Sequence, residues 1–124
     1  MPQSIPATQY SYRRHTKVLV EHPENLEHAA KILKSMAHPM RLKLLCALGN
    51  EECCVKELLC RVGTTQTNVS QHLNILRSTR LVIKRRQGNK YFYRVTHDRT
   101  LELVDRIREA YCPNFNTKST ILKF

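Results

Sequence analysis

The stretch that decides the fold covers residues 55–77 and reads VKELLCRVGTTQTNVSQHLNILR. Its first part has the apolar spacing of a short helix and ends at Gly63, a residue type suited to the turn after a helix. Thr65 can cap a second helix. The apolar stripe of that helix is Val69, Leu73 and Leu76. Two short helices joined by a three-residue turn with a glycine are typical of a helix-turn-helix unit.

Beyond this unit the apolar pattern changes to that of a β-hairpin. Residues 81–86 and 91–95 are rich in β-branched and aromatic side chains, and residues 87–90 form the expected turn. A last helix follows and ends near Pro113. Its apolar residues are Leu101, Val104, Ile107 and Tyr111, with Leu103 and Ala110 beside them.

Two more helices are predicted before the helix-turn-helix unit. One starts at Pro23 and the other runs from Pro39 to Gly49. The apolar stripe of the first helix is Leu26, Ala29, Ala30, Leu33 and either Met36 or Ala37. We therefore expect a mainly α fold with a β-hairpin wing, built as one domain over residues 23–113. Residues 1–22 are expected to form a flexible arm, and residues 114–124 a C-terminal tail.

The charge of the chain points to a polyanionic partner. The 124 residues carry a formal charge of +11, and residues 63–95 contain seven Lys or Arg and no Asp or Glu. Such a segment suits nucleic acid, and less often an anionic membrane surface. The longest apolar run, residues 44–48, is far below the ~20 residues of a membrane span. We therefore expect a cytoplasmic protein without a membrane partner.

Polar side chains on the second helix of the unit are of the types that hydrogen-bond base edges in a DNA major groove. They are Gln66, Thr67, Asn68, Ser70, Gln71, Asn74 and Arg77. The hairpin adds basic residues that can contact phosphates, namely Lys84, Arg85, Arg86 and Lys90. A solvated polar face is the ordinary alternative, and a basic adaptor without sequence-specific DNA contacts is another. No cofactor is expected. An enzyme is disfavoured because Ser70, His72 and His97 lack a paired acid or a phosphate-binding loop.

Three segments resemble the winged-helix repressors of the ArsR/SmtB family. They are residues 35–42, 69–77 and 90–95, which read SMAHPMRL, VSQHLNILR and KYFYRV. The resemblance covers about residues 24–112 and implies a homodimer joined by its first and last helices. It also implies that the fourth helix reads a palindromic operator in double-stranded DNA while the hairpin acts as the wing. Thr67 and Arg80 depart from the family pattern, which has Pro and Gly there.

The five cysteines do not fit a secreted disulfide framework, because their number is odd. A metal-responsive repressor (arsenite, cadmium or zinc) is one hypothesis, with Cys53 and Cys54 as candidate ligands. Lys56 stands where such a site in this family has a second thiol, and the last helix lacks most metal ligands of another known site. We therefore expect no metal site, and a buried or idle thiol at Cys60.

Cys46 and Cys112 form the second hypothesis, which only the resemblance suggests. Their placement is similar to that in the BigR-like branch of the family, which senses reactive sulfur. The resemblance implies that persulfide or an oxidant joins the two thiols through a disulfide or a polysulfide, and that DNA is then released. Lys43 and Arg108 lie one turn before these cysteines and are expected to favour the thiolate. Without the resemblance, Cys46 is an ordinary small core residue.

Overall fold

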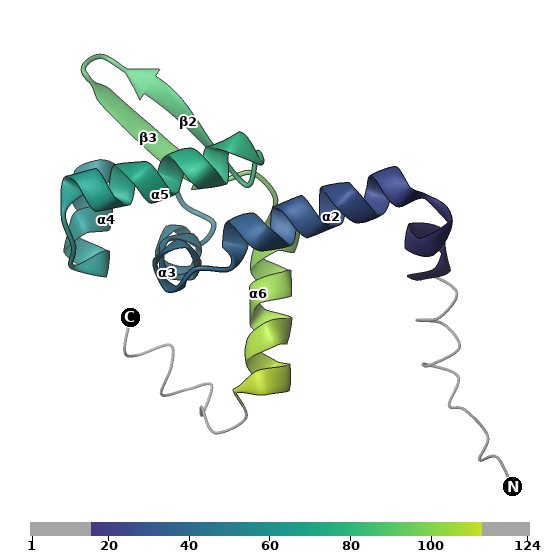
Figure 1. The fold of residues 1–124 in the computed structure, drawn as a ribbon. Helices are drawn as coiled ribbons and strands as arrows, with labels where there is room; N and C mark the ends of the chain where they lie inside the picture. The colour runs from purple at the N-terminus through teal and green to yellow at the C-terminus, as the bar shows by residue number, and fades with distance from the viewer. Residues whose placement is uncertain (1–15, 113–124) are drawn as a thin grey trace, which may run out of the picture. The chain divides into compact units, whose positions relative to one another are not determined.

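The computed structural model describes residues 16–112 (Figure 1), so residues 1–15 of the predicted arm and the whole predicted tail lie outside the described residues. The chain divides into two compact units, residues 1–34 and 35–124. The division falls inside helix α2 (Pro23–Met36), which we expected to belong to one domain with the rest. Ser35 and Met36, which belong to the second unit, are the buried residues of α2.

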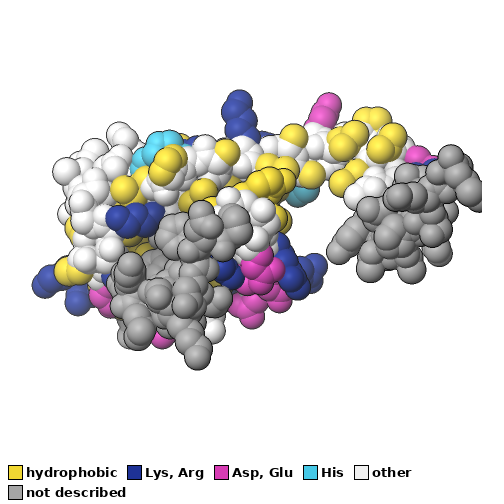
Figure 2. Space-filling view, turned by 90° about the horizontal axis from the view of Figure 1, so that it is seen from below, with side chains coloured by type: hydrophobic (Ala, Val, Ile, Leu, Met, Phe, Trp, Pro, Cys, Tyr) yellow, Lys and Arg dark blue, Asp and Glu magenta, His cyan; other side chains and the backbone are white. Residues whose placement is uncertain are grey.

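The first unit is helical where it is described. Residues 16–21 form a short helix, which the sequence analysis assigned to the flexible arm. An ion pair of 3.5 Å between Lys17 Nζ and Glu21 Oε1, four residues apart, supports this turn. Two residues of the predicted apolar stripe of α2, Leu26 and Leu33, are exposed in the single chain, whereas Met36 at its end is buried. Figure 2 shows hydrophobic side chains along the surface of this helix.

The second unit contains the helix-turn-helix and the wing. Its elements are α3 (Pro39–Leu48), β1 (Cys53–Cys54), α4 (Val55–Val62), α5 (Gln66–Ser78), β2 (Val82–Gln87), β3 (Lys90–Val95) and α6 (Asp98–Tyr111). Helices α3, α4 and α5 pack against one another and enclose the core (Figure 1). The largest fully buried side chains are Leu44, Leu45, Leu48, Cys53, Leu58, Val69, Leu73, Leu76 and Val82. The predicted stripe of α5 is therefore confirmed as core.

The predicted helix boundaries rest on the expected capping residues. Pro39 begins α3, and the Nδ1 atom of His38 accepts a hydrogen bond of 3.0 Å from the backbone N–H of Met40. Gly63 after α4 has a φ of 70°, in the left-handed region. The hydroxyl of Thr65 accepts a hydrogen bond of 3.2 Å from the backbone N–H of Asn68. The turn between α4 and α5 is therefore set by local sequence.

The C-terminal end of α5 contains a left-handed residue that is not glycine. Arg80 has a φ of 61°. Its N–H donates to the carbonyl of Arg77, and the N–H of Leu81 donates to the carbonyl of Leu76, each at 3.0 Å. These two bonds form a Schellman motif, in which glycine is the usual left-handed residue. The helix therefore ends as it would with glycine, but the side chain of Arg80 in the left-handed conformation adds backbone strain.

The wing is a three-stranded antiparallel sheet with strand order β1-β3-β2, whereas the sequence predicted only the hairpin. Strand β1 pairs with β3, so that Cys53 lies opposite Tyr93 and Cys54 opposite Phe92. The hairpin turns at Gly88, where φ is 63°. The additional strand joins the wing to the segment that precedes α4.

Helix α6 begins at Asp98, three residues before the first apolar position of the predicted stripe, and ends at Tyr111. It contacts α3 but contains no buried residue. Leu101 and Val104 are half-buried. Three further apolar residues spaced by four are exposed, namely Leu103, Ile107 and Tyr111. Within residues 16–112, no helix is both long and apolar enough to span a bilayer.

Candidate nucleic-acid interface and cysteine sites

Helix α5 presents two polar faces beside its buried stripe. Gln66, Ser70 and Asn74 are four residues apart and therefore form one row along the helix. Thr67 and Gln71 are exposed and lie in the next row. Both rows project amide or hydroxyl groups away from the core, as base recognition requires.

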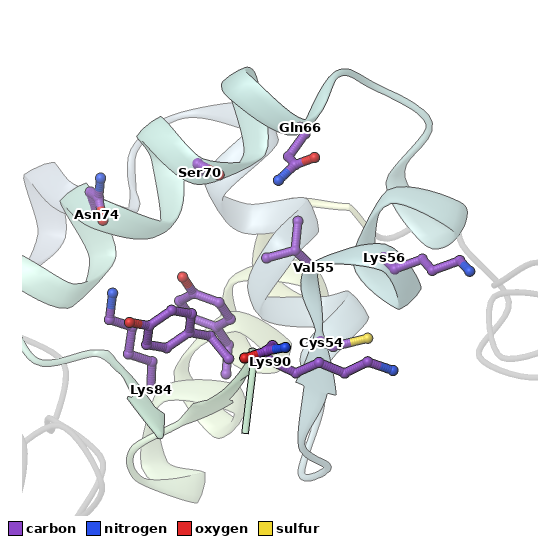
Figure 3. Close-up of a pocket in the computed structure, with 11 residues that line it drawn as sticks. Cys54, Val55, Lys56, Gln66, Ser70, Asn74, Lys84 and Lys90 are labelled. Carbon is purple, nitrogen blue, oxygen red and sulfur yellow. The ribbon is translucent and has the colours of Figure 1, made fainter. Parts of the chain in front are cut away.

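A groove of about 440 Å³ separates α5 from the wing (Figure 3). The row of Gln66, Ser70 and Asn74 forms one side of the groove, and Lys84 and Lys90 of the wing lie on the other. Lys56 of α4, Asn89 and Tyr91 also line it, and sequence reasoning had not selected these three. The aromatic content of the hairpin could have indicated Tyr91, whereas Lys56 and Asn89 carry no local signal.

The two faces of the wing differ in charge and contacts. Lys84 lies opposite Tyr93 in the hairpin register, on the same face as the buried Val82 and Val95. The Nζ atom of Lys84 lies 4.4 Å from the centroid of the Tyr91 ring, a cation–π contact. This face therefore supplies a positioned cation to the groove.

Arg85 points to the other face of the wing and is held by an acid. Its Nε and Nη2 atoms donate to the two carboxylate oxygens of Glu52, each at 2.8 Å, and its guanidinium lies 4.9 Å from the centroid of the Phe92 ring. The hydrogen bonds from Arg85 lower the pKa of Glu52, and the same contact raises the pKa of Arg85. Arg85 was predicted to contact DNA, and the structure places it in this ion pair.

Other predicted DNA-binding residues also have partners in the structure. Arg86 Nε donates to the carbonyl of Gly88 at 2.9 Å, at the tip of the wing. The side-chain amide of Asn68 donates to Thr64 Oγ1 at 3.1 Å. Arg77 Nη1 donates to Asn74 Oδ1 at 3.3 Å. The side chain of Asn68 thus contributes to the turn, and Arg77 lies beside the groove row.

Cys46 and Cys112 lie on different elements and are free thiols. Cys46 is half-buried in α3, and burial raises the pKa of its thiol. Cys112 directly follows α6 and is exposed. The two cations expected to favour the thiolates are engaged elsewhere. Lys43 Nζ donates to the Val62 carbonyl at 3.0 Å, and Arg108 pairs with Asp105 at 2.9 Å.

The other cysteines lie in three distinct environments. Cys53 is buried in β1 and lies outside α4, which begins at Val55. Arg61 Nη1 lies 3.2 Å from Cys53 Sγ, but burial is the larger effect and raises the pKa of this thiol.

The thiol of Cys54 donates to a carboxylate oxygen of Glu57 at 3.4 Å. Cys60 is exposed, which rules out the buried thiol and leaves the idle thiol of the same prediction. Across the described part of the chain, no three His, Cys, Asp or Glu side chains gather into a group that could hold a metal ion.

These features define the class of protein. A helix-turn-helix, a β-sheet wing beside its second helix, and a lysine-lined groove between the two form a winged helix-turn-helix DNA-binding unit. The chain belongs to the ArsR family of bacterial regulatory proteins, whose model matches residues 38–84. It is accordingly a DNA-binding transcriptional regulator.

Similar proteins of known name support this family assignment. The chain is 36% identical over 83 residues to the biofilm growth-associated repressor of Agrobacterium fabrum strain C58, covering 67% of this chain and 71% of that protein. The structure of the transcriptional repressor BigR from Xylella fastidiosa is similar, with a TM-score of 0.66 and 34% identity over 73% of this chain and 92% of that one. Reduced HlyU from Vibrio cholerae N16961 has a TM-score of 0.65 and 34% identity, over 74% of this chain and 97% of that one.

Proposed function

We propose that this protein is a homodimeric repressor that binds a palindromic operator and releases it when Cys46 and Cys112 become bridged. The observation that carries the DNA-binding part of the proposal is the groove itself. Polar side chains of α5 line one side of it, and lysines of the wing line the other. Similarity to two proteins named as repressors supports repression as the outcome of DNA binding.

In this proposal α5 enters the major groove of DNA. Thr67 and Gln71 are exposed and contact base edges, together with the groove row of Gln66, Ser70 and Asn74. The second set of contacts is to phosphates, which position the protein without reading sequence. The side chains proposed for it are Lys56, Lys84 and Lys90, which line the groove.

A second copy of the chain supplies the other half of the interface. The apolar side chains on α2 and α6 remain exposed in one chain, including Leu33 and Ile107. Burying such surfaces between two copies is favourable, because apolar area is removed from water. Two recognition helices related by a two-fold axis read half-sites about 34 Å apart along the DNA. The operator is therefore expected to be a palindrome.

The cysteine pair is the proposed sensor, with a persulfide as the oxidant. The exposed Cys112 thiolate attacks the outer sulfur of glutathione persulfide, which forms a Cys112 persulfide and releases glutathione. The Cys46 thiolate then attacks the Sγ atom of Cys112 and breaks its bond to the outer sulfur, which forms the disulfide and releases hydrogen sulfide. A second persulfide equivalent, first placed on Cys46, leads to a trisulfide with the loss of one hydrogen sulfide. Similarity to HlyU, whose structure is described as that of the reduced protein, supports a redox role.

The bridge can influence DNA binding through the elements it connects. Helix α3 carries Cys46 and packs directly on α5, while Cys112 follows α6, the proposed dimer helix. A bond between them couples the position of the recognition helix to the dimer interface. A coupling free energy of ~1–3 kcal/mol reduces affinity by about 5- to 150-fold.

The experiment measures affinity for a palindromic duplex selected by the reduced protein from a random DNA library. We expect glutathione persulfide to weaken binding of the wild type and dithiothreitol to restore it. Cys46→Ser and Cys112→Ser should bind the duplex, and persulfide treatment should leave their affinity unchanged. Cys60→Ser is the matched control, because Cys60 is also exposed but lies outside the pair. Release by persulfide in both Cys46→Ser and Cys112→Ser would refute the proposed pair.

A further inference from the structure

A polar cluster connects the start of α3 to the recognition helix. The ring of His72 in α5 packs at a tilt of 39° against that of His38, the capping residue of α3, with ring centroids 4.3 Å apart. Arg41 Nη1 lies 3.2 Å from His72 Nδ1. By the helical period, His72 lies on the face of α5 opposite the groove row. The cluster therefore holds α5 from behind its proposed DNA-contacting surface.

The hydrogen bonds of the cluster require both rings to be neutral. Arginine is always a donor, so His72 Nδ1 must accept from Arg41 and cannot carry a proton. His38 Nδ1 accepts from the backbone N–H of Met40 and is likewise unprotonated. Protonation of His72 at Nδ1 would remove the acceptor and place a cation against the guanidinium. The Arg41–His72 contact is therefore sensitive to pH.

Arg41 is itself anchored, so the cluster reaches the C-terminal end of α5. Its Nε atom donates to the backbone carbonyl of Ser35. The hydroxyls of Ser35 and Thr79 are 3.0 Å apart, and Thr79 directly follows α5. One network thus contacts α5 in its middle, at His72, and again at its end.

We propose that His72 is a positioning residue for the recognition helix, and that its protonation loosens α5 and weakens DNA binding at acidic pH. This inference rests on the proposed DNA-binding function of α5. The neutral ring accepts from Arg41 and packs against His38, which fixes the orientation of α5 relative to α3. A protonated ring leaves α5 held by the Ser35–Thr79 contact and by its apolar stripe.

The electrostatic environment favours the neutral ring. Desolvation by burial is the first cause that lowers the pKa of His72, followed by repulsion from His38 once that ring is itself protonated and by the charge of Arg41. These groups face it from the α3 side. Helix α4 and strand β2 also contact α5. Their cations Lys56 and Lys84 line the groove, on the side of α5 opposite His72. Because the pKa is lowered, the contact is intact above the ordinary pKa of histidine and is lost as pH falls through the lower, folded-state value.

The test compares wild type with His72→Asn between pH 8 and pH 5.5 at constant ionic strength. The probe is a fluorescent duplex selected from a random library by the wild type at pH 8. Asparagine places an amide oxygen near the Nδ1 position, so it can accept from Arg41 without titrating. His97→Asn is the matched control, because His97 is exposed and lies outside the cluster. The wild type and His72→Asn share every other histidine, so the ratio of their affinities at each pH isolates the contribution of the His72 cluster.

We expect His72→Asn to match the wild type at pH 8 and to bind more tightly than the wild type at pH 5.5, by less than about tenfold because the lowered pKa leaves part of the wild type neutral at that pH. His97→Asn should follow the wild type throughout. Parallel pH curves for wild type and His72→Asn would overturn the inference. Weak binding by a folded His72→Asn at pH 8 would also overturn it. If the wild type selects no DNA sequence at pH 8, the proposed DNA-binding function fails. That outcome differs from parallel pH curves, which overturn only the role of His72.

Discussion

At the scale of single residues, Arg80 shows how a local departure from the family pattern is accommodated. The Schellman hydrogen bonds at the end of α5 are intact although a side chain occupies the left-handed position. We expect Arg80→Gly to relieve this strain and to stabilise the protein by about 0.5–1 kcal/mol, since glycine adopts that conformation without steric cost.

Thermal unfolding of the reduced protein measures the effect. Arg80→Ala is the matched control, because it removes the guanidinium but keeps a Cβ at the left-handed position. It should gain nothing. A melting temperature of Arg80→Gly at or below that of the wild type would show that the left-handed conformation is not a source of strain.

Cys46 carries a second prediction at the residue scale. Because burial raises the pKa of its thiol, only a small fraction is thiolate near neutral pH. The second step of bridging, attack by Cys46, should therefore accelerate about tenfold per pH unit as the pH rises toward that pKa. Alkylation quenching and mass spectrometry over pH 6.5–8.5 measure the rate. A rate that does not change with pH would argue against Cys46 as the attacking thiol.

At the scale of elements, the local features were predictable from the sequence and the non-local ones were not. The cap at Thr65, the left-handed Gly63 and the α5 stripe depend on residues within a few positions of each other, so the pattern predicted them. Strand β1 was missed because two residues carry no periodicity and its pairing partner, Tyr93, is forty residues away. The contact of Arg41 with His72 likewise depends on packing between helices.

The wing yields a prediction that separates its two faces. Arg85 spans from β2 over Phe92 to Glu52, which neutralises its charge and ties the wing to the segment before β1. We therefore expect Arg85→Gln to leave the salt dependence of DNA binding unchanged. Lys84→Gln, its neighbour on the groove side, should make the slope of log K against log salt shallower by about 0.9, the loss of one phosphate contact.

The measurement is a salt titration of affinity for the selected duplex with wild type and both variants. An equal loss of slope in Arg85→Gln and Lys84→Gln would mean that Arg85 leaves Glu52 to contact a phosphate. The sequence alone predicted DNA contacts for both residues, because the alternation of side chains along a strand does not reveal which face meets an acid from another segment.

At the scale of the whole molecule, the row of exposed apolar side chains on α6 predicts that two copies of the chain form a dimer through this helix. Ile107 lies in the centre of this row, between Leu103 and Tyr111. We expect Ile107→Asp to convert the dimer to a monomer and to weaken operator binding strongly, because two linked half-sites no longer bind together. Sedimentation equilibrium measures the mass. Glu102→Lys changes charge away from this row and should remain dimeric, whereas a dimeric Ile107→Asp would contradict the proposed role of α6.

The most direct test of the central claim is intact mass spectrometry with peptide mapping after the reduced protein is treated with glutathione persulfide. We predict loss of two hydrogens, or loss of two hydrogens with gain of one sulfur, and a crosslink between the peptides that contain Cys46 and Cys112. Unmodified thiols at both positions, or modification confined to Cys53, Cys54 and Cys60, would contradict the account.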